Sequence, residues 1–100
     1  MSQPTTLVVT ASPNPDAPEA TQEYLKGVLP LLMGAGGKPV KRLRVTDVVG
    51  GKRAYGMVLV MDFDSKDAVA ALFESDEYKA HIPVREEGFT SMTINFAEEM

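Results

Sequence analysis

The segment ESDEYKAHIPVREEG, residues 74–88, carries the side chains best suited to chemistry, and His81 is the only histidine in the chain. An imidazole titrates near neutral pH, so His81 could act as a general base or as a haem ligand. A second interpretation is structural. A histidine in the last turn of a short helix, four residues after Glu77, meets the negative helix end and can pair with that carboxylate. Both interpretations remain open from the sequence.

Tyr78 and Arg85 flank this histidine. A guanidinium binds carboxylates through two parallel hydrogen bonds, so Arg85 could anchor an acidic ligand. Alternatively, it pairs on the surface with Glu86 and Glu87, an interaction worth ~0–1 kcal/mol. Tyr78 is either a proton-transfer group or a packing residue with its hydroxyl at the rim of the core.

The overall composition excludes several classes of function. The chain has 100 residues, which predicts a single domain over residues 1–100, and its net charge is −4, which argues against a nucleic-acid partner. There is no cysteine and one histidine, so we expect no disulfide, no zinc site and no cofactor. The N-terminal residues lack the features of a signal peptide, and no apolar stretch reaches the length of a membrane span. We therefore expect a cytoplasmic protein without a membrane partner.

The hydrophobic periodicity predicts the element order β-α-β-β-α-β. Strands are expected at residues 5–11, 38–49, 54–63 and 92–96, and the first helix at 17–35. Asp64 is the expected N-cap of the second helix, and a short helical restart over 75–82 should stop at Pro83. This order predicts a ferredoxin-like α+β fold, a four-stranded antiparallel sheet with two helices on one face.

The segment AYGMVLVMDF, residues 54–63, is apolar on both of its faces. Two helices cover only one face of a sheet, so the other face needs a second cover. We expect a homodimer formed through the sheet faces, with a bound ligand or a different protein as the rival explanation. The segment 38–49 alternates apolar and basic residues, which is typical of an edge strand protected by its charges.

A pocket between the helices and the sheet is the expected site. The predicted catalytic residues are His81 and Tyr78. The predicted substrate-binding residues are Arg85, Tyr24, Tyr55 and Arg53.

Several motifs are similar to those of a known family. They are Tyr24 in the first helix, Gly36–Gly37 after it, Phe63–Asp64–Ser65 before the second helix, and Ser75–Tyr78 followed by Arg85. Over residues 6–96 the chain resembles the 1330 domain-of-unknown-function family, of the dimeric α/β-barrel superfamily. The resemblance implies this fold and a dimer, but no reaction. SDEYKAH also resembles the segment that carries the haem-ligating histidine in haem-degrading monooxygenases of that superfamily, which would make His81 the ligand.

These resemblances leave three hypotheses. The first is a small-molecule-binding homodimer that acts as a cofactor-independent monooxygenase or isomerase, with His81 or a tyrosine transferring a proton and Arg85 anchoring the substrate. The second is a non-catalytic dimer that binds a metabolite or is associated with stress. The third is a haem-binding protein.

Overall fold

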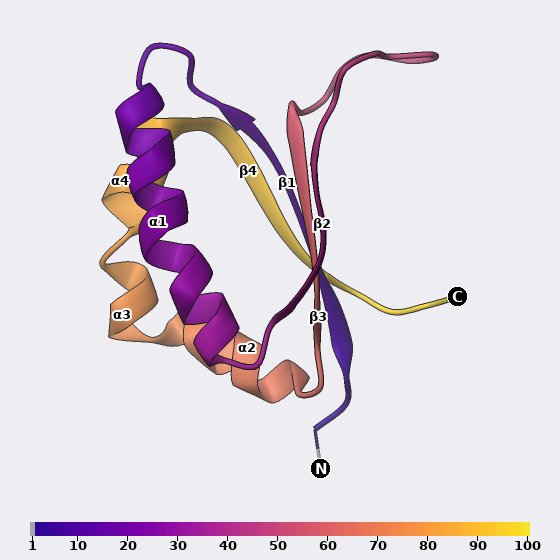
Figure 1. Cartoon of the computed structure of the whole chain (residues 1–100), viewed down its shortest axis with the longest axis vertical. Coiled ribbons are helices and arrows are strands. Elements are labelled where there is room, and N and C mark those ends of the chain that lie inside the picture. Colours follow the sequence, from indigo (N-terminus) through magenta and orange to yellow (C-terminus); the bar gives the residue numbers. More distant parts are fainter. Residues whose placement is uncertain (1) are drawn as a thin grey trace.

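The computed structural model describes residues 2–100 and has two layers, a sheet and a set of helices on one of its faces (Figure 1). The four strands are antiparallel in the order β2-β3-β1-β4. The ferredoxin-like α+β fold is confirmed. The elements are β1 (Thr5–Pro13), α1 (Pro18–Gly34), β2 (Lys38–Arg44), β3 (Met57–Phe63), α2 (Lys66–Glu74), α3 (Asp76–Lys79), α4 (Ile82–Gly88) and β4 (Phe89–Ala97).

Among residues 2–100, the helices are too short or too polar for any of them to cross a membrane.

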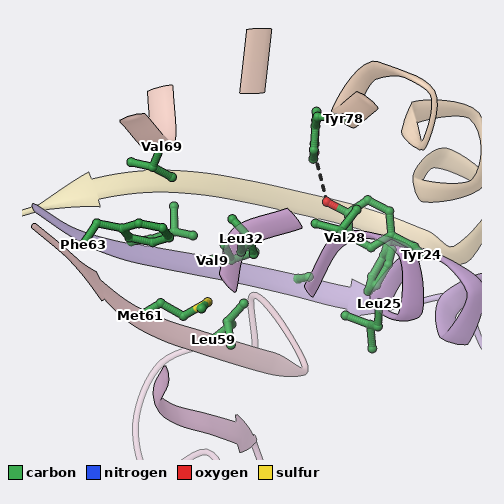
Figure 2. Packing of buried hydrophobic residues seen from close by; sticks show 13 residues of the cluster. Val9, Tyr24, Leu25, Val28, Leu32, Leu59, Met61, Phe63, Val69 and Tyr78 are labelled. Carbon is green, nitrogen blue, oxygen red and sulfur yellow. Dashed lines mark hydrogen bonds between the residues drawn. The ribbon is translucent and has the colours of Figure 1, made fainter. Parts of the chain in front are cut away.

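The core lies between the helices and the inner face of the sheet (Figure 2). Alternate residues of β1 and β3 point into it, because successive side chains of a strand point to opposite faces. Leu7 lies opposite Met61 in the sheet register, and Val9 lies opposite Leu59. The buried cluster comprises Leu7, Val9, Ala11, Tyr24, Leu25, Val28, Leu32, Leu59, Met61, Phe63, Val69, Tyr78 and Phe89.

In the part of the chain that the structure describes, the other face of the sheet carries no helix (Figure 1). We call it the open face and define it by Val8, Thr10, Leu43, Val58 and Val60, which share this side in the sheet register. The sequence prediction that the third strand is apolar on both faces is confirmed. The prediction of an edge strand is also confirmed, because β2 ends the sheet and all its residues are exposed.

The N-cap of α2 is Ser65, so the prediction of Asp64 was wrong. Ser65 has extended backbone angles, φ −129° and ψ 111°, and its hydroxyl accepts a hydrogen bond from the backbone N of Ala68 at 3.2 Å. Asp64 instead accepts from the Lys38 ammonium on β2 at 3.1 Å. Both residue types are good N-caps, and the strand end places the serine, not the aspartate, at the helix start.

The chain between α2 and β4 contains one helix more than the sequence predicted. Ser75 caps α3 as expected, because its hydroxyl accepts from the backbone N of Tyr78 at 3.2 Å. Pro83 does not end the helical region. It lies in the first turn of α4, where a proline is tolerated because its missing N–H would have no helical partner. The break between α3 and α4 turns Arg85 back towards Tyr78.

The connection between β2 and β3 covers residues 45–56 and projects beyond the sheet (Figure 1). The sequence had assigned most of this segment to strands. Gly51 has a φ of 81°, a left-handed backbone conformation that glycine adopts without steric cost. Arg53 and Tyr55 therefore belong to a protruding connection and not to the end of a strand.

Candidate functional site

A hydrogen-bonded chain of side chains links three helices. The hydroxyl of Tyr24 on α1 lies 2.9 Å from the hydroxyl of Tyr78 on α3, and either can be the donor. The Nη1 of Arg85 on α4 donates to the Tyr78 hydroxyl at 2.9 Å. Tyr24 is 4% exposed and Tyr78 is 2% exposed, whereas Arg85 reaches the surface. The structure thus brings together three of the six residues that the sequence singled out.

Aromatic packing holds the two phenol rings in place. Tyr24 meets Phe89 edge to face, with ring centroids 5.4 Å apart, and Tyr78 meets Phe73 in the same way at 4.9 Å. Such edge-to-face pairs stabilise a defined ring orientation by about 0.5–1.5 kcal/mol beyond their buried area. In Figure 2 the Tyr24 and Tyr78 side chains point toward each other across the helix layer. The hydroxyl that receives Arg85 is consequently fixed by the core.

Burial raises the pKa of Tyr24 far above its usual value, and the hydrogen bond and charge interaction with Tyr78 raise it further. The Arg85 guanidinium acts in the opposite direction and is the smaller influence on that pKa. Desolvation disfavours the charged phenolate, so Tyr24 is a neutral phenol at physiological pH. In this state it can donate and accept hydrogen bonds, but it does not act as a base.

Arg85 also lines a hollow of about 370 Å³ beside β4, which we call the Arg85 hollow. Pockets that hold small molecules typically measure roughly 300–1,000 Å³ and combine apolar walls with a few polar groups. The polar groups here are one guanidinium, one carboxylate and two hydroxyls. The lining residues are Arg85, Glu86, Phe89, Thr90, Ser91, Met92 and Ile94.

The guanidinium is not engaged by a neighbouring carboxylate. The ion pairs among residues 2–100 are Lys38–Asp64 and Lys79–Glu74, so the alternative in which Arg85 pairs with Glu86 or Glu87 finds no contact within 4.0 Å. Arg85 makes its side-chain hydrogen bond to Tyr78 only, within this same part of the chain. Its remaining N–H groups are available to a ligand.

His81 lies against α1, outside the hydrogen-bonded chain. Its ring covers Gly27, where a Cβ atom would come within 2.8 Å of Nδ1. Gly27 is one helical turn beyond Tyr24, so the absent side chain makes room for the imidazole. The expected ion pair with Glu77 is not among those of residues 2–100. The role of His81 as a base or haem ligand stays a prediction.

Arg53 and Tyr55 are not brought to the Arg85 hollow. The Nη2 of Arg53 donates to the backbone O of Thr46 at 3.2 Å, which closes the protruding connection on itself. Tyr55 is 38% exposed. The sequence missed Glu86 as a candidate, although it directly follows Arg85 in the chain, and it missed Thr90 because the last strand was expected to start later.

Comparisons with known proteins agree with this architecture. The model of the family described as "Domain of unknown function (DUF1330)" matches residues 6–100. No curated protein matches the chain. A solved protein of unknown function from Rhodopseudomonas palustris is 15% identical, with a TM-score of 0.83 over 100% of this chain and 85% of that one.

Two further solved structures share the fold. A protein from Nitrosomonas europaea, provisionally described as an antibiotic biosynthesis monooxygenase, is 16% identical with a TM-score of 0.69, over 100% of this chain and 93% of that one. A dimeric protein of unknown function and ferredoxin-like fold from Bacteroides fragilis is 14% identical with a TM-score of 0.64, over 96% of each chain. At these identities the likeness shows the fold alone.

Proposed function

Because the chain belongs to the DUF1330 family, whose description names no function, we propose from its geometry that it is a homodimer that binds a small organic anion at Arg85. The observation that carries this proposal is the position of one guanidinium. Arg85 is hydrogen-bonded to a buried tyrosine hydroxyl and also lines a hollow of about 370 Å³.

The hydrogen bond to Tyr78 orients Arg85 before any ligand arrives. An arginine side chain in solution has many rotamers, and fixing them on binding costs about 0.5–1.5 kcal/mol. Here the phenol already holds Nη1, so less of this entropy remains to be lost. The other N–H groups match the two oxygens of a carboxylate. Apolar side chains of Phe89, Met92 and Ile94 line the same hollow and suit the hydrocarbon part of such a ligand.

The open face supports the homodimer. It presents valines and a leucine without a covering helix, and an apolar sheet face of this kind is normally covered. A dimeric assembly is described for solved proteins of this fold from Bacteroides fragilis and Thermobifida fusca. A second copy of this chain would place one open face against the other and leave the Arg85 hollows on the helix side of each sheet.

Glu86 favours a second candidate function, a proton-transfer enzyme of the isomerase or cofactor-independent monooxygenase type. It lines the same hollow as Arg85. A carboxylate can remove a proton next to a carbonyl group while a guanidinium stabilises the resulting enolate oxygen. The neutral Tyr24 phenol does not fit the role of base, and His81 does not line this hollow. In this candidate the expected base is therefore Glu86.

The binding proposal is tested by titrating benzoate into the ¹⁵N-labelled protein and following the amide signals of Phe89 and Met92. We expect saturable shifts in the wild-type protein. In Arg85→Gln the affinity for benzoate should fall by about tenfold, which corresponds to the loss of one charge-assisted contact of about 1.4 kcal/mol. Arg53→Gln is the matched control, because it removes the same charge from the protruding connection. Equal affinity in both variants would refute the role of Arg85.

Native mass spectrometry of the protein purified gently from its host tests the assembly and any retained ligand together. We expect a dimer, and Val58→Lys on the open face should give a monomer. Met33→Lys is the control, because Met33 is 51% exposed on α1 and outside that face. A wild-type monomer would refute the dimer. An added mass that matches an organic anion and is absent from Arg85→Gln would identify the natural ligand. Glu86→Gln should then still bind this ligand but lose any turnover of it.

A further inference from the structure

The edge strand β2 departs from the pattern of the other strands on the helix side of the sheet. In the register, Arg42 lies opposite Leu59 and Arg44 lies opposite Met57. Residues that face each other on neighbouring antiparallel strands point to the same side of a sheet. Leu59 belongs to the buried core, so both arginines point toward the helix layer at positions where β1 and β3 carry apolar side chains.

A groove separates these arginines from α1. Two adjoining hollows, of about 440 Å³ and about 580 Å³, share Gln22, Leu25 and Arg42 in their linings and therefore form one continuous depression. On the helix side the lining extends from Pro18 to Pro30. At a rise of 1.5 Å per residue, these positions span about 18 Å along the helix axis. We call this depression the α1–β2 groove.

Among residues 2–100, the charged side chains that line the α1–β2 groove are all basic. Arg42, Arg44 and Lys26 line it, and neither hollow contains an aspartate or glutamate in its lining, although the whole chain has a net charge of −4. None of the three takes part in the ion pairs found among residues 2–100. The N-terminus of α1 at Pro18 has no side-chain cap, and Glu19 in its first turn is outside both linings.

The remaining walls are largely apolar. Leu25, Leu29 and Pro30 form a stripe along α1, and Met57 closes the end near Arg44. An elongated site with two arginines on its β2 wall and a hydrocarbon surface along its α1 wall matches an amphiphilic anion. We propose that the α1–β2 groove is a second binding site, for a free aliphatic monocarboxylate. The carboxylate would contact Arg42 and Arg44, and the hydrocarbon chain would lie along Leu25 and Leu29.

This site differs from the Arg85 hollow in place and in composition. The two share no lining residue, and the Arg85 hollow contains a carboxylate. The competing explanation for Arg42 and Arg44 is edge protection, in which charged side chains prevent another strand from pairing with β2. For edge protection, the charged side chains of β2 can point to either face of the sheet. Lys41 supplies a test, because it lies opposite Val60 and so points to the open face of the same strand.

The test is a titration of octanoate, below its micelle-forming concentration, into the ¹⁵N-labelled full chain. We expect saturable shifts at the amides of Leu25, Leu29 and Met57. The double variant Arg42→Gln/Arg44→Gln should weaken binding by about tenfold or more, since it removes two charge-assisted contacts. Lys41→Gln should leave the affinity within about twofold, because an exposed charge on the other face contributes little. The neutral alcohol 1-octanol should give no saturable shift at the same amides.

Each departure from these results would overturn the proposal in a recognisable way. Equal binding of 1-octanol would mean that the groove is only an apolar surface. Equal losses in Lys41→Gln and in the double variant would favour general edge charge. Shifts confined to Phe89 and Met92 would assign octanoate to the Arg85 hollow alone. Binding to vesicles of anionic phospholipid without binding of octanoate would indicate a membrane surface in place of the free carboxylate.

Discussion

The hydrogen-bonded chain predicts an uneven effect of removing its two hydroxyls. Tyr78 is the middle member, because its oxygen lies 2.9 Å from both the Tyr24 hydroxyl and Nη1 of Arg85. Tyr78→Phe leaves the Tyr24 hydroxyl, on a residue that is 4% exposed, without its partner. Tyr24→Phe leaves the Tyr78 hydroxyl still accepting from Arg85. Each substitution removes one hydroxyl, but only Tyr78→Phe leaves a buried hydroxyl without a partner.

The expected magnitudes follow from this asymmetry. An orphaned buried polar group costs about 1–3 kcal/mol, whereas a hydrogen bond lost without an orphan costs about 0.5–1.5 kcal/mol. We expect Tyr78→Phe to lower the free energy of unfolding by about 2 kcal/mol and Tyr24→Phe by about 1 kcal/mol. The double variant contains no orphaned hydroxyl. It should lose less than the sum of the single variants, with a coupling of about 1 kcal/mol or more.

Urea denaturation at one fixed protein concentration measures all four free energies. The fixed concentration matters because the stability of the proposed dimer would depend on it. Tyr55→Phe is the control, since Tyr55 is 38% exposed, and it should change the free energy of unfolding by less than about 0.5 kcal/mol. Strict additivity of the two single substitutions, or equal costs for both, would refute the idea of a shared buried chain.

Three further predictions concern residues near the site. The folded state raises the pKa of Tyr24, so the unfolded chain loses this proton first as the pH rises. The free energy of unfolding of the wild type should therefore fall above pH about 10, more steeply than that of Tyr24→Phe by about 1.4 kcal/mol per pH unit. Parallel pH profiles of the two proteins in urea denaturation would contradict this. Gly88→Ala would place a Cβ 2.6 Å from the α1 backbone and should cost about 1–3 kcal/mol by urea denaturation, whereas Gly34→Ala, with open space around it, should cost nothing measurable. Gly27→Ala should displace the His81 ring and change its imidazole NMR signals, with little loss of stability because alanine favours a helix by about 1 kcal/mol; unchanged signals would contradict the packing described above.

The sequence predicted the sheet well because its strands carry clear binary patterns. The sequence pattern of β3 showed that both of its faces are apolar, with Val58 and Val60 on one face and Leu59 and Met61 on the other. Helix boundaries were predicted less well where local signals compete. Asp64 and Ser65 are both good caps, and only the end of β3 decides between them. A proline such as Pro83 is compatible with the end of one helix or with the first turn of the next. In the folded chain a new helix starts after α3, and Pro83 lies in its first turn.

The candidate site was predictable in part. Tyr78 and Arg85 are close in sequence, so their association needed only a turn between two short helices. Tyr24 joins them through a contact across 54 positions, which no local pattern contains. Arg53 and Tyr55 were placed near the pocket because the third strand was expected to begin at residue 54, whereas it begins at Met57. The α1–β2 groove depends on the register between β2 and β3 and on the position of α1 over the sheet. The spacing of residues in the sequence predicts neither.

The positions of the tyrosines also determine the ultraviolet absorption and fluorescence of the protein. The chain contains three tyrosines and no tryptophan, so its near-ultraviolet absorption and emission come chiefly from tyrosine. Tyr24 and Tyr78 share one hydrogen bond, and Tyr78 receives the guanidinium that lines the Arg85 hollow. A ligand anion on the other N–H groups of Arg85 changes the charge beside a buried phenol and the strength of its hydrogen bond. The unlabelled protein therefore contains its own optical reporter, and Tyr55, on the exposed connection, supplies a nearly constant background.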